Sequence, residues 1–291
     1  MKDIRIASTT ACIVLVLLFV GSTILSQQSV AVAREGMLHV TFLDVGQGDA
    51  TLIVSPTGTQ VLIDGGRDGR VVGALQKEIG FFDTDIDMVV ATHPDADHIG
   101  GLINVFKKYT VHTILLTENI NDTPVSDVFQ KAVKTEGATI RYARAGQIYD
   151  LGGGVMGTTT LNILFPDRDP TNLESNMSSI VAQVQYGDIE YLLTGDSPIA
   201  IEQYLVGKEG EVLASEVLKV GHHGSKTSSN ELFVRTVNPQ YAIISAGKDN
   251  SYGHPHKEVT DRLRMLGIAQ KSTIDEGTTN SVSDGKTVWF E

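Results

Sequence analysis

Cysteine is almost absent from this chain, which contains a single one, Cys12, among 291 residues. Cys12 lies inside an apolar segment near the N-terminus, so the sequence that follows this segment has no thiol. Disulfide bridges, thiolate catalysis and cysteine-bound metals are therefore excluded for the main part of the chain.

Basic residues are also scarce, because the chain has 23 Lys and Arg but 35 Asp and Glu, and its formal net charge is −12. This balance argues against a generally basic surface of the kind that coats nucleic acid. A nuclease is still compatible with it, since bound metal ions and a few local lysines attract phosphate where the overall charge does not. The hydrophobic content of 41% is sufficient for a substantial core.

The N-terminal segment has the pattern of a secretory signal peptide. A short basic region precedes the apolar run of residues 11–20, and an Ala-Val-Ala cleavage pattern ends at Ala33. Residues 4–25 are also long enough to be an uncleaved membrane anchor. We expect residues 1–33 to be one or the other, with the protein either secreted into an extracytoplasmic space or anchored to the outer face of the cytoplasmic membrane.

From residue 37 onward, short apolar runs alternate with amphipathic stretches. Residues 38–64 have the pattern of three strands in a meander, residues 87–91 form a buried strand, and residues 99–109 have helical spacing. This alternation indicates a layered α/β fold.

A glycine-rich passage occupies residues 152–157 near the middle of the chain. It lacks the Lys-Ser/Thr ending and the following helix of a phosphate loop. We interpret it as a turn between two halves, residues 37–153 and 154–291.

Residues 92–101, T-H-P-D-A-D-H-I-G-G, contain four metal-ligand side chains between a buried strand and a helix. His93 and Asp95 are two residues apart, so on an extended segment they point the same way and can share one cation. Asp97 and His98 lie across the turn, where they can reach a second cation, as in two-metal hydrolytic sites. A simpler alternative is that Asp97 only caps the helix. The density of ligand-type residues favours the metal site.

More histidines follow two later strands. The first group lies in G-H-H-G-S-K-T-S, residues 221–228, where Ser225 and Lys226 supply donors and one positive charge that can cradle a phosphate. The second pair, His254 and His256, lies at a strand-to-helix junction. Either histidine can bind a phosphate oxygen, protonate a leaving group or simply cap the helix, and we favour His256 for the site.

The decapeptide at residues 92–101 resembles the H-x-H-x-D-H signature of the metallo-β-lactamase fold superfamily. Its T-H-P-D-A-D-H-I-G-G form is similar to that of ComEC-type DNA-internalisation competence proteins and their stand-alone relatives. The motif D-V-G-Q-G-D at residues 44–49 resembles the start of the same hydrolase domain. The resemblance extends over nearly all of residues 37–291, and it implies one hydrolase domain with a four-layer αβ/βα sandwich of two mixed β-sheets.

The resemblance also implies a set of metal ligands. They are His93, Asp95, Asp97, His98, Asp196, His222 and His223. His93 and Asp95 would hold one cation. Asp97 and His98 would hold the other cation together with His222 or His223. Asp196 would bridge the two cations. Asp97 and Asp196 are the catalytic candidates. His222, the first residue after the strand and its glycine, matches the superfamily's histidine better than His223, which either takes that place or binds substrate.

Supporting roles are expected for polar residues near these ligands. They are Asp44, Gln47, Asp49, Asp64 and Asn176. Asp64 belongs to a D-G-G sequence that resembles a strand end near the metal site of the superfamily. Asp44 and Asp49 can alternatively be turn residues.

The sequence departs from the general superfamily pattern at two positions. Asn176, followed by two serines, stands where most members have a third histidine, and Asp95 replaces the second histidine of the signature. Both departures resemble the ComEC-type branch. They leave the first site rich in oxygen ligands, which shifts its preference from Zn²⁺ toward Mn²⁺ or Mg²⁺.

These features predict a metal-dependent hydrolase that carries two divalent ions, Zn²⁺ or Mn²⁺, and acts on a phosphodiester substrate, with DNA as the candidate that the resemblance favours. One alternative is a phosphoesterase for cell-wall polymers or phosphocholine, and a lactone or β-lactam hydrolase is less favoured because the third histidine is missing. Another alternative is a non-catalytic DNA- or wall-binding module. Membrane association would depend on the N-terminal segment.

Overall fold

The computed structural model describes residues 36–291. The predicted signal peptide or membrane anchor, residues 1–33, lies outside the described residues. Within residues 36–291, none of the helices combines the length and apolar character that crossing a membrane requires.

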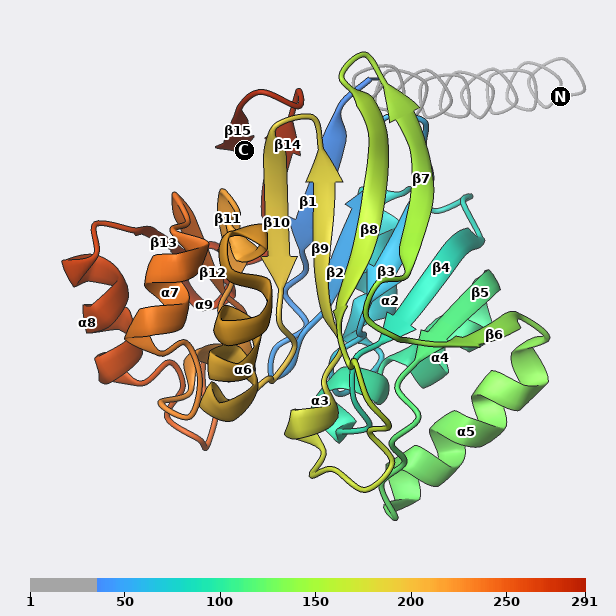
Figure 1. Cartoon of the computed structure of the whole chain (residues 1–291). Coiled ribbons are helices and arrows are strands. Elements are labelled where there is room, and N and C mark those ends of the chain that lie inside the picture. The colour runs from blue at the N-terminus through green and yellow to red at the C-terminus, as the bar shows by residue number, and fades with distance from the viewer. Residues whose placement is uncertain (1–35) are drawn as a thin grey trace, which may run out of the picture. The chain divides into compact units, whose positions relative to one another are not determined.

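Two mixed β-sheets form the centre of the molecule (Figure 1). The first contains, in spatial order, β15 (Val288–Phe290), β14 (Thr279–Ser283), β1 (Leu38–Phe42), β2 (Thr51–Val54), β3 (Gln60–Ile63), β4 (Asp85–Ala91), β5 (Thr110–Leu116) and β6 (Thr139–Tyr142). The second contains β13 (Ala269–Ser272), β12 (Tyr241–Ile244), β11 (Val217–Lys219), β10 (Ile189–Leu193), β9 (Val181–Tyr186), β8 (Gly157–Phe165) and β7 (Ile148–Gly154). Strands β3 to β6 and β10 to β13 pair in parallel, whereas the other neighbours are antiparallel.

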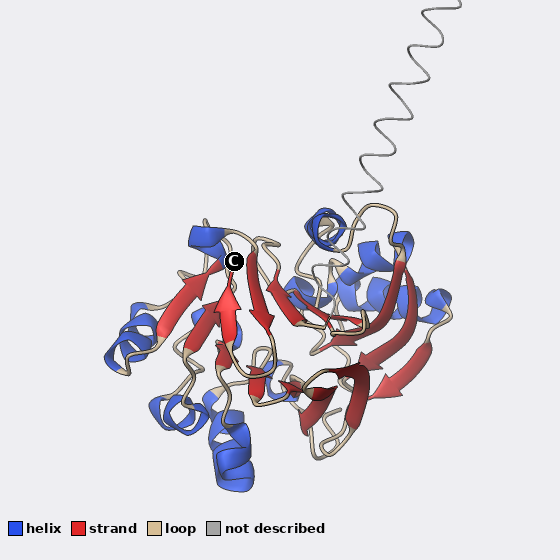
Figure 2. Cartoon of the chain, turned by 90° about the horizontal axis from the view of Figure 1, so that it is seen from above, coloured by secondary structure: helices blue, strands red, loops and turns tan. Residues whose placement is uncertain are grey.

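Helices cover the outer face of each sheet (Figure 2). The first sheet packs against α2 (Arg70–Glu78), α4 (Leu102–Lys108) and α5 (Pro124–Glu136), and the second against α6 (Ile199–Glu209), α7 (Glu231–Val237) and α8 (Lys257–Met265). The short helices are α3 (Ala96–Ile99), α9 (Thr273–Glu276), η1 (Asn176–Ser178), η2 (Gly210–Leu213) and η3 (Gly221–Gly224). The predicted αβ/βα sandwich is confirmed.

Strand β4 shows why this architecture follows from the sequence. Met88 and Val90 lie in the core between the two sheets, whereas Val89 and Ala91 pack under the helices of the first sheet. Successive side chains of a strand point to opposite faces, so a segment covered on both faces, here residues 88–91, is apolar at every position. Each buried Val or Met side chain contributes about 1.5–3 kcal/mol to the stability of the fold.

The predicted division into two halves at residue 153 is wrong. The glycine-rich passage lies within the antiparallel β7–β8 hairpin, and both strands of this hairpin belong to the second sheet. The C-terminal hairpin of β14 and β15 returns to the first sheet, where Ser283 pairs with Leu38 of β1. Apolar periodicity identifies a strand but does not say which sheet it joins, because both sheets bury the same kinds of side chain.

The predicted helix over residues 99–109 is also modified, since it is divided at Gly100 and Gly101 into α3 and α4. The chain is tightly packed at this point. A Cβ atom on Gly101 would lie 1.8 Å from the carbonyl oxygen of Gly65, which no other residue type tolerates. This close approach holds the loop after β3 against the loop after β4, and both loops carry candidate site residues.

Candidate metal centre

The candidate ligands lie where strands of both sheets end. Asp64 follows β3 and His93 follows β4, and because these strands are parallel, both side chains emerge at the same edge of the first sheet. Asp196 follows β10, and the paired histidines His222 and His223 in η3 follow the parallel strand β11. The two sheets therefore bring their polar strand ends to one place.

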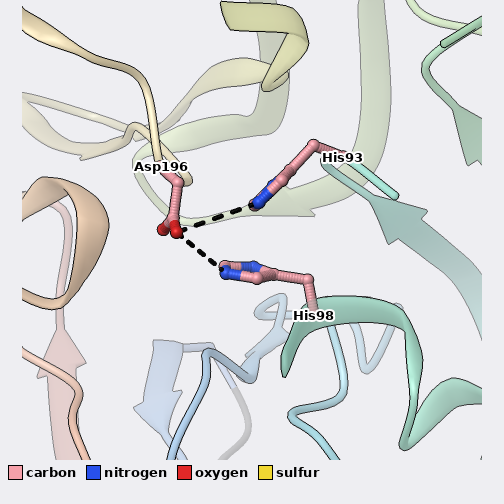
Figure 3. A group of neighbouring side chains, drawn as sticks. All are labelled: His93, His98 and Asp196. Carbon is pink, nitrogen blue, oxygen red and sulfur yellow. Dashed lines mark ion pairs between the residues drawn. The ribbon is translucent and has the colours of Figure 1, made fainter. Parts of the chain in front are cut away.

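Asp196 is the shared partner of this cluster, and its carboxylate faces His93 and His98 (Figure 3). Its Oδ2 atom lies 3.8 Å from His93 Nε2, 3.3 Å from His98 Nε2 and 3.6 Å from His223 Nε2. All four side chains are buried. One carboxylate thus contacts ligands that come from both sheets.

Three groups of side chains have the spacing needed to hold a metal ion. They are His93, His98 and Asp196; Asp97, His98 and His223; and Asp49, Asp196 and His223. Because the groups share Asp196, His98 and His223, they overlap rather than form separate sites. Overlapping His/Asp groups of this kind suggest a binuclear metal site.

Unpaired polar atoms show that these residues fit a bound cation. The Nε2 atoms of His93, His98 and His223 and the Oδ1 atom of Asp196 are buried without a hydrogen-bond partner among residues 36–291. Leaving a buried polar atom unpaired is costly, so several at one point indicate a missing partner. The donor set of imidazole and carboxylate suits Zn²⁺ and other first-row divalent ions.

The opposite ring nitrogen of each histidine is fixed by a neighbour. His98 Nδ1 donates to Asp64 Oδ2 at 2.7 Å, and the Thr92 hydroxyl donates to the same carboxylate oxygen at 2.7 Å. Since the Thr92 proton is used in that bond, Thr92 Oγ1 accepts from His93 Nδ1 at 3.0 Å. The Nε2 atoms of His93 and His98 are therefore directed at the cluster, as in metal sites whose histidines are oriented by outer hydrogen bonds.

His223 is oriented in the same manner by the second sheet. Its Nδ1 atom lies 3.0 Å from the carbonyl oxygen of Ser245, which can only accept, so Nδ1 carries a proton and Nε2 is directed at the cluster. The same Nδ1 lies 3.1 Å from Asp49 Oδ1. The other oxygen of Asp49 forms a 2.7 Å ion pair with Lys219, and both side chains are almost completely buried. Asp49 is therefore held between His223 and a buried ammonium group.

Replacing Asp64 by asparagine should weaken metal binding without removing a ligand atom. The amide can no longer accept from both Thr92 and His98 in the same way, so both histidines lose their fixed orientation. Loss of such an outer partner costs about 10–100-fold in metal affinity. Calorimetric titration with Zn²⁺ and Mn²⁺ measures this loss, and Asp44→Asn is the matched control on an exposed carboxylate. Equal affinities for the two variants would contradict the role of Asp64.

The histidines and carboxylates shift one another's ionisation. Burial alone would lower the pKa of His223, but the carboxylates of Asp196 and Asp49 raise this pKa to about 10. Burial also acts against the charged form of His98, whose pKa is nevertheless raised well above its usual range by Asp196 and Asp64. The pKa of Asp196 is held well below its usual range because His223 and His98 outweigh the effect of burial. Before a metal binds, protons on His98 and His223 take the place of its positive charge.

Metal binding should therefore release protons and strengthen with pH. A cation replaces the protons of His98 and His223, both of which have raised pKa values, so affinity is lowest in acid and increases as the pH approaches the pKa of His223, about 10. The increase should be up to roughly tenfold per pH unit for each proton displaced. Calorimetry in buffers of different ionisation enthalpy counts the protons released. A binding enthalpy that does not vary with the buffer would contradict this expectation.

The relative roles of His222 and His223 differ from the sequence-based preference. His223 is buried and belongs to two of the three groups, whereas His222 is partly exposed, lies 3.7 Å from Asp196 and belongs to none of them. Both residues have left-handed backbone dihedrals, with φ of 48° and 54°. The chain therefore turns sharply after β11, which directs the second histidine inward. Such a conformation costs roughly 1–3 kcal/mol per residue and is typical of functional sites.

Asp95 lies beside the cluster but outside the three groups. Its Oδ2 atom is 3.7 Å from His93 Nε2, and its Oδ1 atom accepts from Asn121 at 2.7 Å and from Ser175 at 2.6 Å. Ser175 is the neighbour of Asn176, whose Oδ1 atom is buried without a hydrogen-bond partner among the described residues. The segment that stands in place of the superfamily's third histidine thus supplies a hydrogen bond to Asp95 through Ser175.

The D-V-G-Q-G-D motif packs directly on the ligand cluster. A Cβ atom on Gly48 would lie 2.0 Å from the backbone oxygen of Asp97, so only glycine allows this approach. Gln47 Nε2 donates to Asp97 Oδ2 at 3.5 Å. The Asp44 carboxylate instead accepts from the backbone N–H of Gly46, and the Asp44 backbone N–H donates to the Thr278 hydroxyl outside the cluster. Asp44 is therefore a turn residue.

The predicted substrate residues lie on the outer side of the centre. Ser225 is buried and contacts Thr227 through their hydroxyl groups at 2.9 Å, whereas Lys226 is exposed. The backbone N–H of Lys226 donates to His256 Nδ1 at 3.2 Å, so His256 supports this loop. His254 is the histidine nearer the cluster, with its ring 5.5 Å from that of His222.

Several contributors were not identified from the sequence. They are Thr92, Asn121, Ser175 and Lys219. Only Lys219 leaves a clear signal, because a lysine within the otherwise apolar strand V-L-K-V implies a buried carboxylate partner. The others act through contacts between distant segments.

A sandwich of two mixed sheets with a His/Asp cluster at the strand ends defines a class of metal-binding α/β proteins. The model of the Metallo-beta-lactamase superfamily matches residues 43–248, and the chain therefore belongs to this superfamily. The predicted family is confirmed.

The chain is related to competence proteins. It is 30% identical over 298 residues to ComE operon protein 3 of Bacillus subtilis (strain 168), covering 96% of this chain and 36% of that protein. It is 31% identical to Competence protein ComA of Neisseria gonorrhoeae over 80% of this chain and 30% of that protein. The chain thus spans roughly a third of the length of these relatives.

Solved structures share the fold at low sequence identity. The metallo-beta-lactamase fold protein YhfI from Bacillus subtilis has a TM-score of 0.50 and 14% identity, covering 87% of this chain and 99% of that one. CmlA, a diiron beta-hydroxylase from Streptomyces venezuelae, has a TM-score of 0.52 and 13% identity, covering 81% of this chain and 53% of that one. At these identities, the similarity concerns the fold alone.

Proposed function

We propose that this protein is a metal-dependent phosphodiesterase that cleaves DNA. The observation that carries the proposal is the set of three buried histidines whose unpaired Nε2 atoms surround Asp196. DNA is chosen because the chain is related to Competence protein ComA and its decapeptide resembles that of DNA-internalisation competence proteins. On the strength of the N-terminal pattern alone, we also propose that the enzyme acts outside the cytoplasmic membrane.

Two divalent ions, Zn²⁺ or Mn²⁺, would supply Lewis acidity and lower the pKa of bound water. His93, His98 and Asp196 would hold one ion. The other would be held by Asp97, His98 and His223, or by Asp49, Asp196 and His223. Asp64 and Asp49 keep the rings of His98 and His223 turned inward. Lys226, on the exposed loop after η3, would attract a phosphate of the substrate.

The experiment is hydrolysis of single- and double-stranded DNA, beside bis-p-nitrophenyl phosphate, by the protein with Mn²⁺ or Zn²⁺. Asp97→Ala is the inactive control, because Asp97 lies in one of the ligand groups. DNA cleavage that this variant lacks supports the proposal. Hydrolysis of the small diester without DNA cleavage would favour a wall-polymer phosphoesterase instead. Inactivity toward both substrates at full metal occupancy would reject the phosphodiesterase and favour a binding module.

A further inference from the structure

A row of aromatic rings connects the metal centre to the surface. His222 lies beside Asp196, the ring of His254 is 5.5 Å from that of His222, and the ring of Tyr252 is 5.7 Å from that of His254. Tyr252 and His254 are stacked, with an angle of 20° between their planes. Tyr252 is 53% exposed, so the outer end of the row is open to solvent.

The loop that carries this row is held in place by one side chain. Asn250 Nδ2 donates to the carbonyl oxygens of Gly247 at 2.8 Å and His254 at 2.7 Å, and Asn250 Oδ1 accepts from the His254 N–H at 2.9 Å. The loop therefore has a fixed shape before any ligand arrives. A preformed surface loses less conformational entropy on binding than a mobile one.

The same loop is connected to the metal ligands. The N–H of Gly247 donates to Gln47 Oε1 at 3.4 Å, and Gln47 Nε2 donates to Asp97 Oδ2 at 3.5 Å. A Cβ atom on Gly247 would lie 2.9 Å from the backbone nitrogen of Gln47, so the two segments are in close contact. The position of Tyr252 relative to the cluster is thus set by direct contacts.

The chemistry of this loop fits a nucleobase better than a simple phosphate. Lys248 is exposed in the loop, but Asp249 beside it is exposed as well and opposes its charge. An exposed ring stacked on another ring instead offers a flat apolar face. Proteins that bind single-stranded nucleic acid use such rings, since every base has a face that can stack.

We propose that Tyr252, stacked on His254, binds a base of a single-stranded nucleic acid and so positions the neighbouring phosphodiester at the metal centre. This inference rests on the proposed phosphodiesterase function and adds the class of substrate. A base paired within a duplex does not offer its face, so single strands are the preferred substrate. A wall polymer has no base to stack on Tyr252, so Tyr252 would not contribute to its binding.

The test combines a change in the protein with a change in the substrate. The substrates are a single-stranded oligodeoxynucleotide, its duplex, and single-stranded versions in which one nucleotide at a time is abasic. The variants are Tyr252→Ala, Tyr252→Phe and Tyr142→Ala. Tyr142 is the matched control, since it is 49% exposed but lies on the edge strand β6.

We expect Tyr252→Ala to lower kcat/KM on the ordinary single strand by about 5- to 150-fold, the usual range for loss of one stacked base. Tyr252→Phe and Tyr142→Ala should retain the wild-type value. An abasic nucleotide at the stacking position should cause a similar loss in the wild type. The two changes together should cost no more than either alone, because they remove the same contact.

The inference is overturned if Tyr252→Ala behaves like Tyr142→Ala, if the abasic and alanine losses multiply, or if duplex is cleaved as fast as single strand. Binding of the same oligonucleotides, followed by fluorescence anisotropy, separates this failure from failure of the proposed function. If no DNA is cleaved, the nuclease proposal fails, while binding that depends on Tyr252 would still support the stacking site. Binding that is insensitive to Tyr252 would reject it.

Discussion

Asp196→Asn should abolish most of the hydrolytic activity and reduce the bound metal. Asp196 lies within 4 Å of four histidines and belongs to two of the three ligand groups, so its loss weakens the whole cluster. A bound ion supplies several kcal/mol of charge stabilisation, and a loss of about 4 kcal/mol corresponds to roughly 10³-fold in rate. Metal content by mass spectrometry and kcat/KM on bis-p-nitrophenyl phosphate measure the two effects.

Asp188→Asn is the matched control, because Asp188 is exposed in the turn between β9 and β10, at the other end of the strand that Asp196 follows. This variant should retain full metal content and activity. If Asp196→Asn keeps both metal equivalents, Asp196 is not a bridging ligand. Circular dichroism of both variants would show whether the fold itself has changed.

Lys219→Met should destabilise the protein more than most single substitutions. Lys219 forms a 2.7 Å ion pair with Asp49, and the two side chains are 3% and 7% exposed. Methionine fills a similar volume but leaves the Asp49 carboxylate buried beside an apolar group. Breaking a buried ion pair by removing one partner costs about 3–5 kcal/mol. Urea unfolding in the presence of a chelator measures this loss without a contribution from bound metal.

Two further variants separate charge from packing at this position. In Lys219→Met/Asp49→Asn no unpaired charge remains, so much of the lost stability should return. Lys271→Met, on the neighbouring part of the second sheet, removes a more exposed pair with Glu276 and should change the free energy of unfolding by about 1 kcal/mol or less. If Lys219→Met and Lys271→Met lower the free energy of unfolding equally, burial of the Asp49–Lys219 pair does not increase its contribution to stability.

Much of the fold was predictable because it depends on local patterns. The apolar run of β4 identifies a strand buried on both faces, and the following T-H-P-D-A-D-H-I-G-G segment places ligand-type side chains at its end. The D-G-G motif was likewise placed at a strand end, and its Asp64 proved to hold His98. In each case the residues that matter are neighbours in the sequence.

The assignment of strands to sheets was not predictable in this way. Strand β7 follows β6 along the chain but belongs to the other sheet, and β14 pairs with β1 from the opposite end of the described residues. Which distant strands form hydrogen bonds with each other depends on how whole layers pack. The apolar periodicity within one segment contains no information about that packing.

The sequence by itself determined the class of fold, the absence of thiol chemistry and the residue types that could bind a metal, because these follow from composition and from spacing within single segments. Only the tertiary structure decided which of the paired histidines turns inward, that Asp95 lies at the margin of the cluster, and that Lys219 neutralises Asp49. Each of these depends on a contact between segments far apart in the chain. Such contacts determine both how deeply a side chain is buried and which charges lie beside it.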